Sequence, residues 1–290
     1  MGTGAIDGKA TTGRTAPVDA AVPTTTRPRS RVAILTALAV GLPLLFLTLP
    51  LIALTGEALP ALDELTPETR ETLGQALRVS LLTTSISLLL IIGLGTPFAF
   101  VLARRRLPAA RLLNALIDLP IVLPPSVAGI ALLMAFGRNG LVGGWLADVG
   151  ITVGFTTTAV VLAQCFVAAP LYIRAAKVGF GLVEREVEDA AMVDGATPAT
   201  VFRTITMPLA RASLVAGVVL AWARALGEFG ATIMVAGSFT GRTQTMPLAI
   251  YERFGAGDLT SALTLSIVLL ATSLVVLVAI RYLGEPTTPR

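Results

Sequence analysis

The chain of 290 residues contains no histidine and only one cysteine, Cys165. Without histidine, metal sites that need imidazole ligands and Ser-His-Asp catalysis are excluded. A lone cysteine cannot form a disulfide within the chain, and no Cys-x-x-Cys spacing is present. The phosphate-binding pattern Gly-x-x-x-x-Gly-Lys-[Ser/Thr] is also missing, so the sequence offers no ordinary site for ATP hydrolysis.

Charged residues are scarce too, at 14% of the chain, against about 25% in ordinary soluble proteins. Hydrophobic residues make up 54%, and the mean hydropathy is +0.80. They gather in long runs, and a run of about 20 apolar residues is long enough to cross a membrane as a helix. The sequence therefore predicts an all-α polytopic membrane protein with six transmembrane helices, at about residues 32–54, 79–103, 112–136, 157–176, 209–236 and 261–280.

The first 30 residues differ from the rest because Thr, Ala, Pro and Gly dominate them. Such a composition cannot bury a core, so residues 1–30 are predicted to form a disordered tail. The apolar run at 32–54 exceeds the roughly 7–15 residues of a signal-peptide core, and it is predicted to remain as a span. The membrane domain is then residues 31–283, with no further soluble domain expected behind it.

The distribution of lysine and arginine predicts the orientation of the spans. Segments rich in these residues stay on the cytoplasmic side. One set of connecting segments holds most of them, whereas the other holds only Arg70, Arg78, Arg138, Arg242 and Arg253. Both termini are therefore predicted to be cytoplasmic, and the acidic loop 55–75 to lie outside. The same sorting of charge indicates membrane topology rather than nucleic-acid binding.

Residues 184–208 form a polar stretch in an otherwise apolar chain, and the charge distribution places this 184–208 segment in the cytoplasm. Acidic residues crowd the first turns of a predicted helix, where they favour the positive end of its dipole. Gly195 predicts a sharp turn between two short helices, because glycine adopts backbone conformations that other residues disfavour. The segment is either a docking element for a soluble partner or an amphipathic connector on the membrane surface.

Two further features lie inside the predicted spans. Pro120, Pro124 and Pro125 remove backbone donors, which is tolerated in a membrane where the break faces protein or a wet cavity. Arg224 and Glu228 are four residues apart and share a helix face. Each feature has two interpretations, a lining of a translocation pathway or a packed structural element. Asp118 is either a helix-start residue or part of a gate, and the outer segment 237–259 either contacts a delivery protein or folds on its own scaffold.

The run Asp189-Ala-Ala-Met-Val-Asp-Gly-Ala196, followed by Ile205-Thr-Met-Pro208, resembles the Glu-Ala-Ala loop of ABC importer permeases. Asp189 stands where that family has Glu, and Met207 where it has Leu. In the family this loop forms the coupling helix that docks into the ATP-hydrolysing subunit. The resemblance implies a type I permease fold and assigns the docking role to Glu188, Asp189, Ala190, Ala191, Asp194, Gly195 and Ala196.

Three more blocks resemble the permeases of molybdate and sulfate importers, and among these the molybdate permeases most. The first comprises residues 98–103, 119–125 and 136–140, the second is residues 223–232, and the third is residues 241–251. The resemblance implies a homodimer in the cytoplasmic membrane with its pathway between the two copies. Two ABC ATPase subunits that use ATP and Mg²⁺ and an extracytoplasmic oxyanion-binding protein would complete the importer, in contact with lipid, and this chain would bind no cofactor, metal or nucleic acid.

The predicted function is thus the membrane subunit of an ATP-driven importer of molybdate, with tungstate accepted. Within the class, sulfate or tungstate are the alternative substrates. Outside it, an ion-coupled transporter or channel would leave the 184–208 segment without a role. A membrane-embedded enzyme would need catalytic groups at one depth, whereas the carboxylates here are dispersed.

Overall fold

The computed structural model describes residues 1–2, 29–63, 65–105 and 110–284. The predicted tail, residues 1–30, falls almost entirely outside this part of the chain. Every regular element in the described residues is helical, which confirms the predicted all-α class. The helices are α1 (Arg29–Ala61), α2 (Pro67–Arg104), α3 (Ala110–Val122), α4 (Pro125–Phe136), α5 (Gly143–Asp148), α6 (Thr157–Leu182), α7 (Arg185–Val193), α8 (Pro198–Val201), the π-helix η1 (Phe202–Thr206), α9 (Met207–Leu226), α10 (Gly230–Ala236), α11 (Met246–Gly255) and α12 (Leu259–Gly284).

The chain divides into two units, Met1–Leu51 and Ile52–Arg290. The first unit contains most of α1, an apolar helix whose candidate span, Ala33–Ala61, has a mean hydropathy of 2.4. The second unit contains all the other helices and is described by itself below. α2 begins at Pro67, well before the predicted start at residue 79, because Thr66 caps it by accepting a hydrogen bond from the Thr69 amide.

Five helices in the described residues are long and apolar enough to cross a membrane, and a bent pair raises this number to six. The bent pair is α3 and α4, which meet at an angle of 114° where a single span over 112–136 was predicted. The break falls at Leu123 and Pro124, since Pro124 and Pro125 supply no amide hydrogen to continue the helix. The predicted span 209–236 is likewise in two pieces, because α9 ends at Leu226 and α10 starts at Gly230.

The core of the second unit is built by α2, α6 and α9. Small residues let α6 and α9 approach closely, as is usual between membrane helices. A Cβ added to Gly179 would lie 2.6 Å from Ser213 Cβ, and one added to Gly217 would lie 2.9 Å from Ala175 Cβ. Polar side chains join α2 to α6, where Ser87 donates a 3.0 Å hydrogen bond to Gln164.

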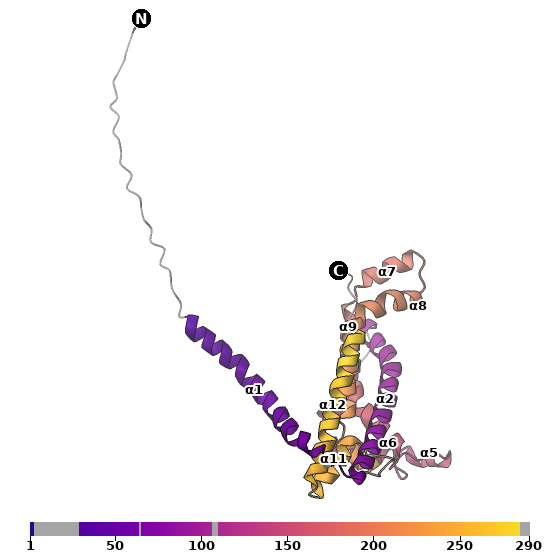
Figure 1. The fold of residues 1–290 in the computed structure, drawn as a ribbon. Helices are drawn as coiled ribbons and strands as arrows, with labels where there is room; N and C mark the ends of the chain where they lie inside the picture. The colour runs from indigo at the N-terminus through magenta and orange to yellow at the C-terminus, as the bar shows by residue number, and fades with distance from the viewer. Residues whose placement is uncertain (3–28, 64, 106–109, 285–290) are drawn as a thin grey trace. The chain divides into compact units, whose positions relative to one another are not determined.

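The bundle of the second unit has two distinct ends. Figure 1 shows α7 and α8 projecting at one end, and α5 and α11 at the other. α2 runs between these ends, and its 38 residues correspond to about 57 Å at 1.5 Å per residue. The two ends are therefore a membrane thickness or more apart, so an element at one end influences the other only through the spans.

Candidate coupling segment and membrane break

The turn at Gly195 has the geometry that its sequence predicts. α7 ends at Val193, Asp194 is its C-cap residue, and Gly195 follows with a φ of +92°. The Ala196 amide donates to the Ala191 carbonyl at 3.0 Å, and the Gly195 amide donates to the Met192 carbonyl at 3.1 Å. This pair of bonds is the Schellman arrangement, which satisfies the last carbonyls of the helix and needs a left-handed residue at this position. α8 then starts behind Thr197, whose hydroxyl accepts from the Thr200 amide.

Most of the residues predicted to dock lie on the surface of this turn. Asp189, Ala190, Asp194 and Gly195 are exposed, and Ala191 and Ala196 are half-buried. Two apolar neighbours, Met192 and Val193, were not among the predicted docking residues, yet both are exposed, and Val193 is 87% exposed. Both residues lie in the last turn of α7, just before the glycine that ends it, and this position in the sequence could have marked them as part of the exposed surface. Together these residues form an apolar tip bordered by carboxylates.

Glu188 does not belong to that exposed surface. Its Oε1 atom pairs with Arg104 Nη2 at 2.7 Å and accepts a 2.6 Å hydrogen bond from the Thr206 hydroxyl. The side chains of Arg104 and Glu188 are only 12% and 13% exposed. Arg104 also donates to the Val183 carbonyl at 3.0 Å. Glu188 is therefore an internal brace that joins α7 to the ends of α2 and α6 and to η1.

The proline break and the charged pair, which the sequence left as separate features, lie side by side. A Cβ added to Gly230 would be 2.5 Å from Pro125 Cβ, and one added to Gly129 would be 2.6 Å from the Ala231 carbonyl oxygen. The α3–α4 break and the α9–α10 break thus touch through positions where only glycine leaves room. Pro124 provides the extended residue before α4, with φ −54° and ψ 136°.

Arg224 and Glu228 form an ion pair, with Nη1 and Oε2 2.6 Å apart. The Glu228 side chain is 1% exposed, while that of Arg224 is 35% exposed. The second Glu228 oxygen accepts a 2.7 Å hydrogen bond from the Ala231 amide, so this carboxylate also caps α10. Glu228 is fully engaged in the protein, and the open side of the pair belongs to Arg224.

Asp118 lies well inside α3, so the interpretation as a helix-start residue is wrong. It accepts a hydrogen bond from Arg174 Nε at 2.5 Å, and the neighbouring Asn114 accepts one from Lys177 at 2.7 Å. Both contacts join α3 to α6. They border a cavity of about 390 Å³ between the two helices.

Comparison with known proteins identifies the family. Residues 95–285 match the family described as binding-protein-dependent transport system inner membrane component. The chain belongs to this family. The matched range contains the 184–208 segment, the Glu188 brace and the Arg224–Glu228 pair.

Three curated relatives are similar over most of their length. Molybdenum transport system permease protein ModB of Mycobacterium tuberculosis is 46% identical over 207 residues, which is 71% of this chain and 78% of ModB. The probable transport system permease protein NifC of Clostridium pasteurianum is 41% identical over 204 residues, or 70% and 71% of the two chains. Sulfate transport system permease protein CysW of Synechococcus elongatus is 38% identical over 218 residues, or 75% and 76%.

Solved structures support the permease fold. A chain of a bacterial ABC transporter involved in the import of the acidic polysaccharide alginate aligns over 90% of this protein and 98% of that chain. The TM-score is 0.68 at 15% sequence identity. A chain of the MetNI methionine ABC transporter in an inward-facing conformation aligns over 76% and 96%, with a TM-score of 0.57 at 18% identity. The protein is therefore a multi-pass membrane permease with an ABC importer fold.

Proposed function

We propose that this permease is the membrane subunit of an ATP-driven importer that carries molybdate into the cell and also accepts tungstate. The observation that supports molybdate as the substrate is the 46% identity to the molybdenum permease ModB of Mycobacterium tuberculosis. Sulfate is the second candidate, since the sulfate permease CysW is 38% identical over a similar length. Both anions are tetrahedral and doubly charged, so the same membrane subunit architecture suits either one.

Genetic rescue tests the substrate. The permease is expressed with its ATPase and binding protein in a strain that lacks molybdate transport, and activity of a molybdenum-cofactor enzyme is measured at trace molybdate. Recovery of this activity is the expected result. Recovery of growth in a sulfate-transport mutant, without recovery of the molybdenum enzyme, would assign sulfate and leave the permease class unchanged.

The permease is proposed to work as a homodimer with two ABC ATPase subunits and an extracytoplasmic binding protein. The family description, a binding-protein-dependent transport system, supports a delivery protein. The exposed tip of the 184–208 segment supports a cytoplasmic partner, because Met192 and Val193 would gain by being covered. The permease itself contributes no catalytic group; ATP and Mg²⁺ belong to the ATPase.

The Glu188 brace suggests how the ATPase moves the spans. When the ATPase subunits close around ATP, each pulls the tip that it holds. Because Glu188 is bonded to Arg104 and Thr206, α7 cannot shift without moving the end of α2 and the start of α9. Both α2 and α9 pack on α6. A displacement of the 184–208 segment would therefore rotate these core helices together and open the pathway to the outside.

The adjoining breaks at Pro124, Pro125 and Glu228 are proposed to line the pathway. Arg224 would give a passing oxyanion a positive station, and Glu228 would restrain the strength of that attraction by pairing with it. A charge within the membrane is costly unless it has an ion-pair partner or faces water. Arg224 has Glu228 as its partner, and its partly exposed side chain is free to face a water-filled pathway.

A double substitution separates the pathway role from a structural one. Arg224→Ala alone leaves Glu228 buried and unpaired, at a cost of about 3–5 kcal/mol, so assembly suffers. Combining Arg224→Ala with Glu228→Gln removes both charges and keeps an acceptor for the Ala231 amide. We expect this double variant to assemble normally and to lose at least roughly tenfold in uptake. Normal uptake by the assembled double variant would show that the pair is only structural.

The arginine distribution supports cytoplasmic termini and a cytoplasmic 184–208 segment. Single cysteines at Thr66 and Thr197, each in a Cys165→Ser background, test this orientation because both positions are exposed. An impermeant thiol reagent applied to intact cells should label the Thr66→Cys variant and leave Thr197→Cys unlabelled until the cells are opened. The reverse pattern would invert the proposed topology.

A further inference from the structure

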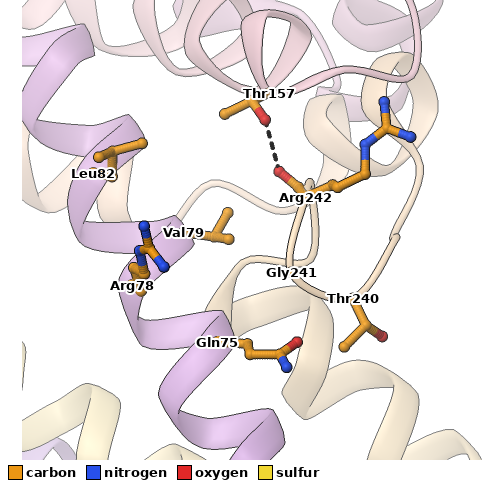
Figure 2. Close-up of a pocket in the computed structure, with 8 residues that line it drawn as sticks. All are labelled: Gln75, Arg78, Val79, Leu82, Thr157, Thr240, Gly241 and Arg242. Atoms are coloured by element: carbon orange, nitrogen blue, oxygen red, sulfur yellow. Dashed lines mark hydrogen bonds between the residues drawn. The ribbon is translucent and has the colours of Figure 1, made fainter.

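A pocket of about 520 Å³ lies at the end of the bundle far from the 184–208 segment. Figure 2 shows it between α2, the start of α6 and the loop 237–245 that joins α10 to α11. Arg78 lies 26 residues before Arg104 on α2, or about 39 Å along the helix axis. Under the proposed topology this pocket therefore opens on the outer side of the membrane.

The pocket is lined by two arginines that form no ion pair with any of the described residues. Arg78 and Arg242 line it, both are exposed, and within the described part of the chain neither guanidinium has an ion pair. By contrast, Arg253 at the same end pairs with both Glu68 and Asp258. An acid near the pocket, Glu71, accepts a 2.9 Å hydrogen bond from Nε2 of the Gln75 side chain, which itself lines the pocket.

Arg242 is held by a rigid loop. The Arg242, Thr243 and Gln244 amides all donate to the Phe239 carbonyl, and the Arg242 carbonyl accepts a 2.9 Å hydrogen bond from the Thr157 hydroxyl. Thr243 is fully buried and accepts from the Phe239 amide. The loop backbone is thus fixed before any ligand arrives, which lowers the entropy that binding must overcome.

We propose that this pocket is the docking surface for an acidic face of the extracytoplasmic binding protein, an inference that rests on the proposed function. The guanidinium groups lie on opposite sides of the pocket, one on α2 and one on the loop, and do not converge on one point (Figure 2). A single small oxyanion would contact one of them in water, where an isolated exposed ion pair contributes little. A protein surface with two or more carboxylates engages both at once and shields them from solvent.

Binding kinetics of the complete transporter test the docking surface. The permease with its ATPase is reconstituted in nanodiscs, and association of the molybdate-loaded binding protein is followed at several salt concentrations. Arg78→Gln with Arg242→Gln should slow association roughly tenfold and flatten its salt dependence, because unpaired rim charges act mainly through electrostatic steering. Arg70→Gln is the matched control, since Arg70 is an exposed arginine on α2 that does not line the pocket.

Two results would overturn the proposal. One is association of the double variant at the wild-type rate with the wild-type salt dependence. The other is binding of radiolabelled molybdate to the permease alone that disappears in the double variant, which would make the pocket an oxyanion site. Uptake by the wild-type complex is measured in the same preparation. If the wild type transports molybdate and the double variant associates normally, the docking surface fails while the proposed function stands.

Discussion

Gly195→Val should reduce ATP-driven uptake to background while leaving the permease in the membrane. Gly195 has a φ of +92°, and left-handed backbone costs a residue with a Cβ about 1–2 kcal/mol, with β-branched residues the worst placed. A Cβ at this position meets no atom within 4 Å, so the damage comes from backbone strain alone. Loss of the Schellman turn would displace the exposed tip that the ATPase is proposed to hold.

The measurements are membrane abundance, recovery of the ATPase with the permease, and ATP hydrolysis stimulated by the loaded binding protein. Gly181→Val is the matched control, because Gly181 also has open space around a new Cβ but lies in the helical backbone of α6. Gly195→Asn should keep part of the activity, since asparagine tolerates the left-handed region better than valine. Full stimulated hydrolysis and uptake in Gly195→Val would show that this turn does not couple the two subunits.

Glu188→Ala should be the most damaging substitution in the 184–208 segment for assembly. It leaves Arg104, whose side chain is 12% exposed, without its ion-pair partner. Removing one member of a buried ion pair lowers the folding stability by about 3–5 kcal/mol. Because both side chains keep some contact with solvent, we expect the loss of stability to lie near the lower end of that range. Recovery of the intact complex from membranes should fall, and ATP hydrolysed per anion transported should rise in whatever complex remains.

Glu186→Ala is the control for Glu188→Ala, because Glu186 is an exposed carboxylate on the same helix. Exchanging the charges, with Arg104→Glu and Glu188→Arg together, should restore part of the assembly. Glu188→Gln retains the acceptor for Thr206 and should assemble better than Glu188→Ala while remaining poorly coupled. Equal behaviour of Glu188→Ala and Glu186→Ala would remove the brace from the mechanism.

The features predicted well from sequence are those with local causes. A glycine that ends a helix and a proline that interrupts one change the backbone only within a few residues. The turn at Gly195 and the break at Pro124 could therefore be foreseen from the local sequence. Apolar run length likewise depends on the chain alone, and it predicts most of the spans. The interruption after Leu226 was harder to see, because the Glu228 carboxylate caps the start of α10 with a side-chain hydrogen bond that no periodicity reveals.

The features that escaped prediction depend on contacts between distant residues. Glu188 reads as one more surface acid of α7, and its true partner, Arg104, is 84 residues away. Nothing in the sequence pairs Pro125 with Gly230, whose missing Cβ lets the two breaks touch. Arg78 and Arg242 likewise line one pocket only because α2 and the loop after α10 lie at the same end of the helical bundle.

The most direct test of the whole account is molybdate uptake by purified components in proteoliposomes. The permease and its ATPase are reconstituted, loaded binding protein is supplied on the outer side of the permease, and ATP on the other. Accumulation of radiolabelled molybdate should require ATP and the binding protein, and excess sulfate should compete poorly. Uptake driven by an ion gradient in the absence of the ATPase would contradict the account.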